Sequence, residues 1–318
     1  MNILVGAPNE NFDLEKMKQK MLKHPGLMKE KLFFADQGLT RDELDSIDVI
    51  IGYDQKLVPQ IIYSPTSRLK WIQALSVGVD YFPLAEIKNR GIRLATVKGI
   101  HSEPIAETVI GMIFGQYRNL NRINTIGRWE KPAHPFKTLA GKSVVIYGTG
   151  AIGMRVAEIL KTFNVTTVGI NHSGHQAKFF DSTFTMDDFS PAVTNADIII
   201  NSLPLMPATD HFFDQKYFNR LTNQPLFINV GRGGSVVTDD LINALNARTL
   251  SAASLDVADP EPFPDNNPLW QMDNVFISPH IASLFDQYGE QSLEIFSKNL
   301  REYEYDGALL VNEVNLNK

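Results

Sequence analysis

The sequence predicts an α/β fold with two doubly wound parallel-sheet domains, and three observations support this prediction. Short, uninterrupted apolar runs, many of them β-branched, alternate with helix-like stretches along almost the whole chain. Such runs are typical of strands that are buried on both faces, as in a parallel sheet. The runs fall into two groups, and the 318 residues are about twice a common domain length of roughly 150 residues. We therefore expect two such domains with a cleft between them.

The predicted elements divide the chain discontinuously. The first group of strands comprises residues 2–5, 49–52, 71–74 and 93–96. The second group comprises residues 143–147, 165–168, 198–200, 226–229, 252–255 and 275–277. A helix between the groups is expected to begin near Ser102, a good N-cap, with Pro104 tolerated in its first turn. A last helical pattern is expected to return to the first domain. The predicted domains are residues 1–98 with 286–318 for the substrate, and 99–285 for a dinucleotide.

The composition of the chain is that of a globular protein, and its charge argues against nucleic-acid and membrane binding. Hydrophobic residues make up 43% and charged residues 21% of the chain, which is ordinary for a globular protein. The 30 basic and 36 acidic residues give a net charge of −6, so we expect neither nucleic-acid nor membrane binding. The lysine-rich stretch 15–31 also contains Glu15 and Glu30 and is interpreted as the solvated face of a surface helix.

The sequence lacks cysteine, paired histidines, a secretory signal and a membrane span, and these absences bear on metal binding, redox chemistry and cellular location. Cysteine is absent, which excludes disulfides, thiolate metal sites and a cysteine nucleophile. The 7 histidines show no paired metal-ligand spacing, so we expect no metal. The N-terminus does not read as a secretory signal, and no apolar run is long enough to span a membrane. The sequence therefore predicts a cytoplasmic protein.

A glycine-rich motif is the first candidate binding site. Gly148, Gly150 and Gly153 fit G-x-G-x-x-G directly after the predicted strand 143–147 and open a helical pattern. In that context the glycines allow a tight turn, close approach of a pyrophosphate and close helix–strand packing. The helix N-terminus supplies amides to the phosphates. The motif predicts a Rossmann-like domain whose residues Gly148, Gly150, Ala151, Ile152 and Gly153 bind a dinucleotide.

The residue that ends the next strand bears on the choice of cofactor. An acidic residue there would bind the ribose of NAD and repel a 2′-phosphate. This chain has Asn171, followed by His172 and Ser173, and none of these repels a phosphate. We predict that these three residues contact the cofactor, which is NADP or NAD, with NADP favoured. Contact between Asn171 and the ribose of NAD is the open alternative.

Three polar residues follow three successive predicted strands of the second domain. They are Arg232, Glu261 and His280, and the carboxyl ends of parallel strands meet at the edge where ligands bind. A guanidinium can hold a carboxylate with two hydrogen bonds. A histidine can give a proton to a keto oxygen, and a glutamate beside it favours the imidazolium. The pattern predicts hydride transfer between a nicotinamide cofactor and a 2-oxo or 2-hydroxy acid.

These motifs together resemble the D-isomer-specific 2-hydroxyacid dehydrogenase family over nearly the whole chain. Further matching segments are Ser76-Val77-Gly78-Val79-Asp80, Ile105-Ala106-Glu107, Leu139-Ala140-Gly141-Lys142, Leu203-Pro204-Leu205 with Thr209, Leu255-Asp256-Val257 and Ser278-Pro279-His280-Ile281-Ala282.

The resemblance implies roles for several of these residues. Arg232, Glu261 and His280 would be the catalytic set, with His280 as proton donor. It also implies that amides near Val77 and Gly78 help to hold the substrate carboxylate. It assigns Asp256 to the nicotinamide carboxamide, Val230 to the lining of the cofactor site, and a homodimer to the whole protein.

Two other functions stay open at this point. A dinucleotide-sensing regulatory protein of the same fold can retain the Arg–Glu–His set. Phosphoglycerate dehydrogenase is the alternative within enzymes, although no cluster of Arg or Lys in the first domain's loops points to a phosphorylated substrate. The sequence does not identify the 2-hydroxy acid, the physiological direction or the pathway.

Overall fold

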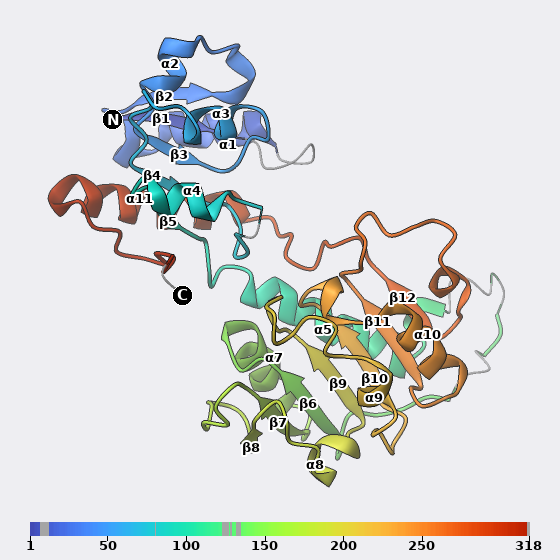
Figure 1. Ribbon diagram of the computed structural model, residues 1–318. Helices are drawn as coiled ribbons and strands as arrows, with labels where there is room; N and C mark the ends of the chain where they lie inside the picture. Colours follow the sequence, from blue (N-terminus) through green and yellow to red (C-terminus); the bar gives the residue numbers. More distant parts are fainter. Residues whose placement is uncertain (7–12, 80, 123–126, 128, 132–134, 317–318) are drawn as a thin grey trace. The chain divides into compact units, whose positions relative to one another are not determined.

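The chain folds into two compact units, each built on one parallel sheet (Figure 1). The computed structural model describes residues 1–6, 13–79, 81–122, 127, 129–131 and 135–316. Unit 1 comprises Met1–Ile100 and Phe285–Lys318, and unit 2 comprises His101–Leu284. All described strand pairs in both sheets are parallel. The predicted fold class is therefore confirmed.

Unit 1 has a five-stranded sheet in the order β2-β1-β3-β4-β5, one of the two common doubly wound orders. Its strands are β1 (Asn2–Val5), β2 (Lys31–Phe34), β3 (Val49–Ile51), β4 (Trp71–Gln73) and β5 (Arg93–Ala95). Four of these lie where the sequence predicts them, and three of the four end one residue earlier than expected. The sequence analysis missed β2, an edge strand with only two buried residues at the end of the lysine-rich stretch.

Helices cover both faces of this sheet because successive side chains of its strands point to opposite sides. Helices α1 (Leu14–Lys23) and α11 (Tyr288–Asp306) pack on one face. Helices α2 (Arg41–Asp45), α3 (Leu57–Ile62) and α4 (Leu84–Asn89) cover the other. The ring of Phe296 on α11 lies 5.4 Å from that of Trp71 on β4. The last helix thus packs on the sheet of unit 1.

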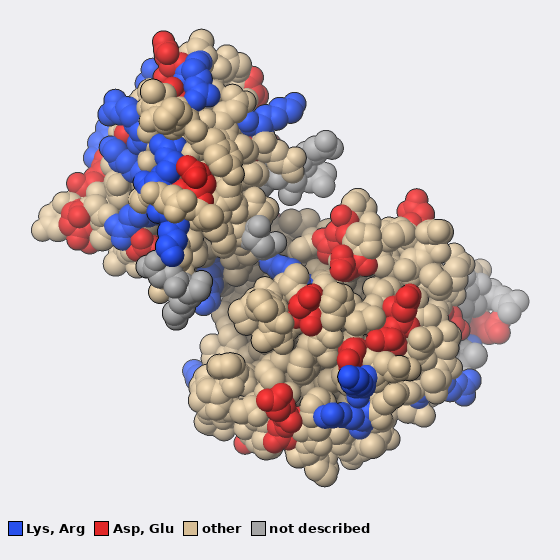
Figure 2. All heavy atoms as spheres, viewed as in Figure 1, with Lys and Arg blue, Asp and Glu red and all other residues tan. Residues whose placement is uncertain are grey.

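The lysine-rich stretch forms less helix than predicted. Helix α1 ends at Lys23, a 3-10 turn spans Pro25–Leu27, and Lys31 already belongs to β2. Ion pairs join Lys20 to Glu290 and Lys29 to Glu304. On the face of unit 1 drawn in Figure 2, Lys and Arg side chains are interspersed with Asp and Glu. This pairing supports the interpretation as a solvated face.

Unit 2 has a seven-stranded sheet in the order β12-β11-β10-β9-β6-β7-β8. Its strands are β6 (Ser143–Tyr147), β7 (Thr166–Ile170), β8 (Ser182–Phe184), β9 (Ile198–Asn201), β10 (Leu226–Asn229), β11 (Ala252–Leu255) and β12 (Val275–Ile277). Strand β7 runs two residues further than predicted. The edge strand β8 was missed because all three of its residues are only partly buried and leave no apolar run in the sequence.

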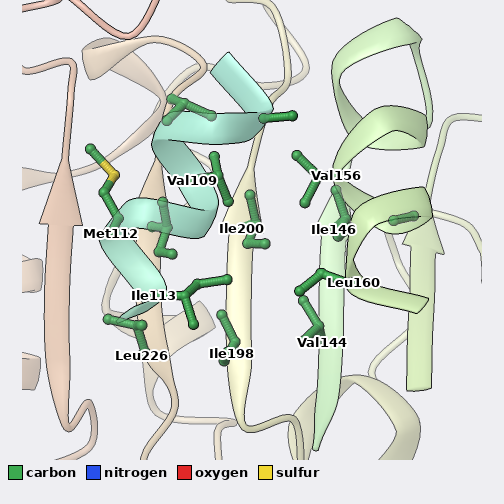
Figure 3. Packing of buried hydrophobic residues seen from close by; sticks show 14 of the residues in the cluster. Val109, Met112, Ile113, Val144, Ile146, Val156, Leu160, Ile198, Ile200 and Leu226 are labelled. Carbon is green, nitrogen blue, oxygen red and sulfur yellow. The ribbon is translucent and has the colours of Figure 1, made fainter. Parts of the chain in front are cut away.

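Two helices pack together on one face of this sheet (Figure 3). They are α5 (Ser102–Tyr117), through Val109 and Ile113, and α7 (Ala151–Lys161), through Val156 and Leu160. Ser102 was predicted as the N-cap of α5, but it is the first helical residue and His101 takes the N-cap position.

The other face of the unit 2 sheet is covered by short helices. These are α8 (Pro191–Thr194), α9 (Gln215–Phe218) and α10 (Thr238–Asn246). None of the helices in the described part of the chain combines the length and the apolarity that crossing a membrane requires.

Candidate active site

The strand order of unit 2 reverses between β6 and β9, and this is where open α/β sheets bind ligands. From β6 the chain moves outward to β7 and β8, then returns to place β9 on the other side of β6. The glycine motif follows β6, and Ser202 follows β9. The Ser202 hydroxyl donates to the carbonyl of Tyr147 at 2.9 Å, which joins the two strand ends.

The glycine motif forms a cradle that fits a dinucleotide pyrophosphate. Gly148 has a φ of +98°, which favours glycine. A Cβ on Gly153 would lie 1.9 Å from the carbonyl oxygen of Gly148, so the helix passes this turn at close range. A Cβ on Gly150 would meet no described atom within 4 Å. Gly150 is the N-cap of α7, and within the described chain no side chain caps this helix. Its first amides can thus serve an anion.

Asn171 is bonded within the loop that follows β7. Its side chain is 8% exposed and lies inside the loop that follows β7. Its Nδ2 donates to Thr149 Oγ1 at 3.2 Å and to the carbonyl of His175 at 2.9 Å. Its Oδ1 accepts from the amide of Ser173 at 3.2 Å. Both amide protons of Asn171 are therefore engaged within the protein and tie this loop to the glycine motif. Its contact with the cofactor stays a prediction.

Exposed polar side chains surround Asn171 in the same loop. His172 and Ser173, which the sequence analysis named, are both exposed. The Ser173 hydroxyl lies 2.8 Å from Nδ1 of His175, another exposed residue that the sequence analysis did not select. These groups, rather than the Asn171 amide, are presented at the loop surface.

Glu261 and His280 form an acid–base pair. Nδ1 of His280 lies 2.8 Å from Oε2 of Glu261, and Oε1 of Glu261 accepts from the amide of Ala258 at 3.1 Å. The His280 side chain is 45% exposed and the Glu261 side chain is 40% exposed. With Nδ1 on the carboxylate, Nε2 is the nitrogen that can exchange a proton with a ligand.

The pair shifts both pKa values in the direction that proton donation needs. The hydrogen bond that His280 donates to the Glu261 carboxylate raises the pKa of His280 above its ordinary value, against partial burial and the charge of Arg232. Burial alone would raise the pKa of Glu261, but its bonds to His280 and the Ala258 amide and the nearby positive charges lower it. The arrangement therefore favours an imidazolium beside a carboxylate.

Arg232 lies close enough to influence both members of this pair. Its positive charge acts on His280 and on Glu261. Its Nη1 donates to the carbonyl of Gly231 at 2.8 Å. A Cβ on Gly233 would lie 1.8 Å from the carbonyl oxygen of Ala258, so the Arg232 turn packs directly on the Glu261 loop. The structure thus brings the three predicted catalytic side chains to one edge of the sheet.

Asp256 supports the turn that carries His280. Its carboxylate, 3% exposed, accepts hydrogen bonds from Ser278 Oγ at 2.6 Å and from the amides of Ile281 and Ala282, each at 3.0 Å. His280 itself has a φ of +55°, and its amide donates to the Asp256 carbonyl at 2.8 Å. This carboxylate fixes the turn; its contact with a nicotinamide carboxamide stays a prediction.

The remaining predicted residues have simpler surroundings. Val230 directly follows β10 and is 7% exposed. In unit 1, Val77 and Gly78 follow β4 in a turn where Ser76 Oγ donates to the Gly78 carbonyl at 2.7 Å. Asp80 lies outside the described residues. The roles implied for Val77, Gly78 and Val230 stay predictions.

Several polar residues near the site were missed by the sequence analysis. They are Thr149, His175, Asn201, Ser202, Asn229 and Ser235. A signal exists for two of them, because the apolar strands β9 and β10 each end on an asparagine. No group of three or more His, Cys, Asp or Glu side chains among the described residues could hold a metal ion.

The strand order, the glycine cradle and the His280–Glu261 pair define a dinucleotide-binding α/β protein equipped for proton transfer. The family model for the NAD binding domain of D-isomer specific 2-hydroxyacid dehydrogenases matches residues 110–282. Human glyoxylate reductase/hydroxypyruvate reductase is 34% identical over 233 residues, which cover 70% of each chain. Glyoxylate reductase from Thermofilum pendens is 30% identical and covers 73% of this chain and 71% of its own.

The fold is also similar to the folds of related proteins with solved structures. A D-isomer specific 2-hydroxyacid dehydrogenase family protein from Aeromonas salmonicida has a TM-score of 0.84 at 26% identity, with 99% of each chain covered. Phosphoglycerate dehydrogenase from Lactobacillus plantarum has a TM-score of 0.57 at 33% identity, covering 99% of this chain and 100% of its own. The chain belongs to the D-isomer specific 2-hydroxyacid dehydrogenase family. It is an NAD(P)-dependent oxidoreductase, which confirms the predicted family and enzyme class.

Proposed function

We propose that this protein reduces a small 2-oxo acid to the D-2-hydroxy acid, and catalyses the reverse oxidation, with His280 as the proton donor. The observation that carries the proposal is the 2.8 Å contact between His280 Nδ1 and Glu261 Oε2, on the same sheet edge as the glycine cradle. This contact leaves Nε2 of His280 as the donor and favours the protonated imidazole. Relatives that act on glyoxylate and hydroxypyruvate support a small 2-oxo acid.

Each member of the set then has a distinct task. The guanidinium of Arg232 binds the carboxylate of the acid with two parallel hydrogen bonds. Nε2 of His280 gives its proton to the keto oxygen, which becomes the hydroxyl. Glu261 stabilises the imidazolium before that transfer. The bound nicotinamide supplies the hydride to the keto carbon.

The cofactor would lie with its pyrophosphate on the Gly148–Gly153 turn and on the first amides of α7. We favour NADPH over NADH because the loop after β7 holds no carboxylate at Asn171 and presents the exposed His172, Ser173 and His175. Position 171 therefore has no side chain that would repel the 2′-phosphate of NADPH, and the exposed polar groups of the loop can bind that phosphate.

Phosphoglycerate dehydrogenase is the second candidate. It is supported by the 33% identity over 99% of this chain to the Lactobacillus plantarum enzyme. 3-Phosphoglycerate with either oxidised cofactor distinguishes it from the first proposal. A dinucleotide-sensing protein is the third, and binding without turnover would indicate it.

Other properties are proposed from the sequence analysis: the domain division and the location from its patterns, and the homodimer from the resemblance. Residues 1–98 with 286–318 would bind the substrate and residues 99–285 the cofactor. The protein would be a homodimer in the cytoplasm.

The proposed function is tested by consumption of NADPH and NADH with purified protein. The panel is glyoxylate, hydroxypyruvate, pyruvate, phenylpyruvate and branched 2-oxo acids, with 3-phosphoglycerate oxidation assayed beside it. We expect turnover with at least one small 2-oxo acid and a lower KM for NADPH. Oxidation of 3-phosphoglycerate in preference to every member of the panel would replace the first proposal with the second.

A further inference from the structure

A cluster of fully buried polar side chains lies beneath the Arg232 turn. Asn201 ends β9, Asn229 ends β10, and Ser235 lies in the 3-10 turn after Arg232. Their exposed fractions are 0%, 1% and 0%. Buried amides and hydroxyls are costly unless each of their donors is paired, so a cluster of this kind needs a complete set of hydrogen bonds.

Two members of the cluster bind the main chain of the Arg232 turn directly. The carbonyl of Arg232 accepts from Asn229 Nδ2 at 3.1 Å and from Ser235 Oγ at 2.7 Å. The amide of Gly231, on the other side of Arg232, donates to Asn229 Oδ1 at 3.1 Å. Buried side chains therefore hold the Arg232–Gly233 peptide group, which follows Arg232, and the Val230–Gly231 peptide group, which lies one residue before it.

Asn201 joins these two residues to the neighbouring strand. Its Nδ2 donates to Asn229 Oδ1 at 2.9 Å and to Ser235 Oγ at 2.8 Å, and its Oδ1 accepts from the amide of Leu203 at 3.1 Å. The single hydroxyl proton of Ser235 goes to the Arg232 carbonyl, so Ser235 accepts from Asn201. Both amide protons of Asn201 are used, and the direction of each bond is fixed.

We propose that Asn201, Asn229 and Ser235 are positioning residues that aim the guanidinium of Arg232 at the substrate carboxylate. The proposal rests on the carboxylate-binding role proposed for Arg232. The network is not needed to pair the strands, since β9 and β10 already pair in register at Asn201 and Asn229. What the network adds is a single backbone conformation at Arg232, and a bidentate contact needs such precision.

The test is a double-mutant cycle on Ser235→Ala and Arg232→Ala. For wild type, both single variants and the double variant, kcat and KM for the best 2-oxo acid and the Kd of the reduced cofactor are measured. We expect Ser235→Ala to raise KM for the 2-oxo acid by about tenfold or more, and to change the cofactor Kd less than twofold. In the Arg232→Ala background we expect Ser235→Ala to change kcat/KM less than twofold, because there is no guanidinium left to position.

Ser254→Ala is the matched control. Ser254 is also 0% exposed, lies in β11 of the same sheet and is bonded to Gln116 on α5, away from the Arg232 turn. It should leave kcat/KM unchanged. Should Ser235→Ala fail to fold, Ser235→Cys keeps the side-chain size while weakening the hydrogen bond to the Arg232 carbonyl.

The outcomes separate this inference from the proposed function. If Ser235→Ala lowers kcat/KM equally with and without Arg232, the network is merely structural and the inference is overturned while the role of Arg232 stands. If Arg232→Ala alone leaves KM unchanged, both the role of Arg232 and the inference fail. A KM effect of Ser235→Ala that disappears without Arg232 supports both.

Discussion

His280 shows how one residue acquires its chemistry from its neighbours. The Glu261 carboxylate on Nδ1 raises the pKa of the imidazole. Asp256 holds the turn that places the ring, with its carboxylate on the amides of Ile281 and Ala282. Two buried or half-buried carboxylates thus serve one histidine, one by tuning its protonation and the other by fixing its position.

The pH profile of the reaction should report this tuning. Reduction needs protonated His280, so kcat/KM for the 2-oxo acid should be high below the raised pKa and should fall as the pH rises through it. Oxidation needs the neutral ring and should show the opposite trend. Glu261→Gln removes the main cause of the raised pKa, so the descending limb for reduction should move to lower pH.

The control for this experiment is Asp259→Asn. Asp259 is an exposed acidic residue of the same loop, so its loss changes the net charge equally. Asp259→Asn should shift the descending limb of the reduction profile less than Glu261→Gln does. Identical limbs in wild type and Glu261→Gln would contradict the assignment of the Glu261–His280 pair.

Asn171 allows a second test at the residue scale. Asn171→Asp places a carboxylate beside the proposed 2′-phosphate site and removes the donors to Thr149 and His175. Like-charge repulsion should raise the Kd of NADPH at least about tenfold, or 1.4 kcal/mol, and that of NADH less. Titration of both cofactors by fluorescence measures this. Equal changes in the two Kd values would mean that position 171 acts only through the shape of the loop.

The chemistry of single residues was more predictable than their contacts. Arg232, Glu261 and His280 follow successive strands, so parallel-sheet geometry alone was enough to bring them together. The bonds of Asn171 depend on how the loop folds back to His175, four residues later, and no local pattern encodes that fold. Nor does the sequence indicate that the Asp256 carboxylate serves the His280 turn 25 residues away.

Two glycines of the β6–α7 turn have contrasting steric surroundings. A methyl group at Gly150 would meet empty space, whereas one at Gly153 would collide with the Gly148 carbonyl at 1.9 Å. Gly150→Ala should therefore fold with little loss of stability but block close approach of the pyrophosphate, weakening cofactor binding. Gly153→Ala should lower the free energy of unfolding by about 1–3 kcal/mol.

Urea unfolding and cofactor titration of the two variants distinguish these effects. Each variant serves as the control for the other, because both add one methyl group to the same turn. Normal cofactor binding by Gly150→Ala would show that the dinucleotide does not approach this turn.

Secondary structure was predicted best where strands are buried on both faces. Strands β6, β9 and β10 are almost entirely buried, and each contains an uninterrupted run of three or more apolar residues. The two missed strands, β2 and β8, lie at sheet edges, where fewer residues are buried and the apolar signal is weak.

At the scale of the whole molecule, the chain has two sheets with separate cores. The apolar clusters around the unit 1 sheet contain residues of unit 1, and those around the unit 2 sheet contain residues of unit 2. Because the proposed cofactor site lies on unit 2, NADPH at about 100 times its Kd should stabilise that unit by about 2.7 kcal/mol.

Hydrogen exchange followed by mass spectrometry can locate this stabilisation. We expect slower exchange in β6 and β9 and in the turn at 148–153, with β1 and β3 of unit 1 changing less. Protection confined to unit 1 would contradict the placement of the cofactor.

The decisive measurement compares His280→Ala with wild type, using the best 2-oxo acid and cofactor from the substrate panel. Both kcat/KM and the Kd of the reduced cofactor are determined at a pH where wild-type reduction is maximal. Loss of the proton donor should lower kcat/KM by about 10²–10⁴-fold and leave the cofactor Kd nearly unchanged, since His280 lies outside the glycine cradle. Near-normal turnover by His280→Ala would contradict the proposal that His280 supplies the proton.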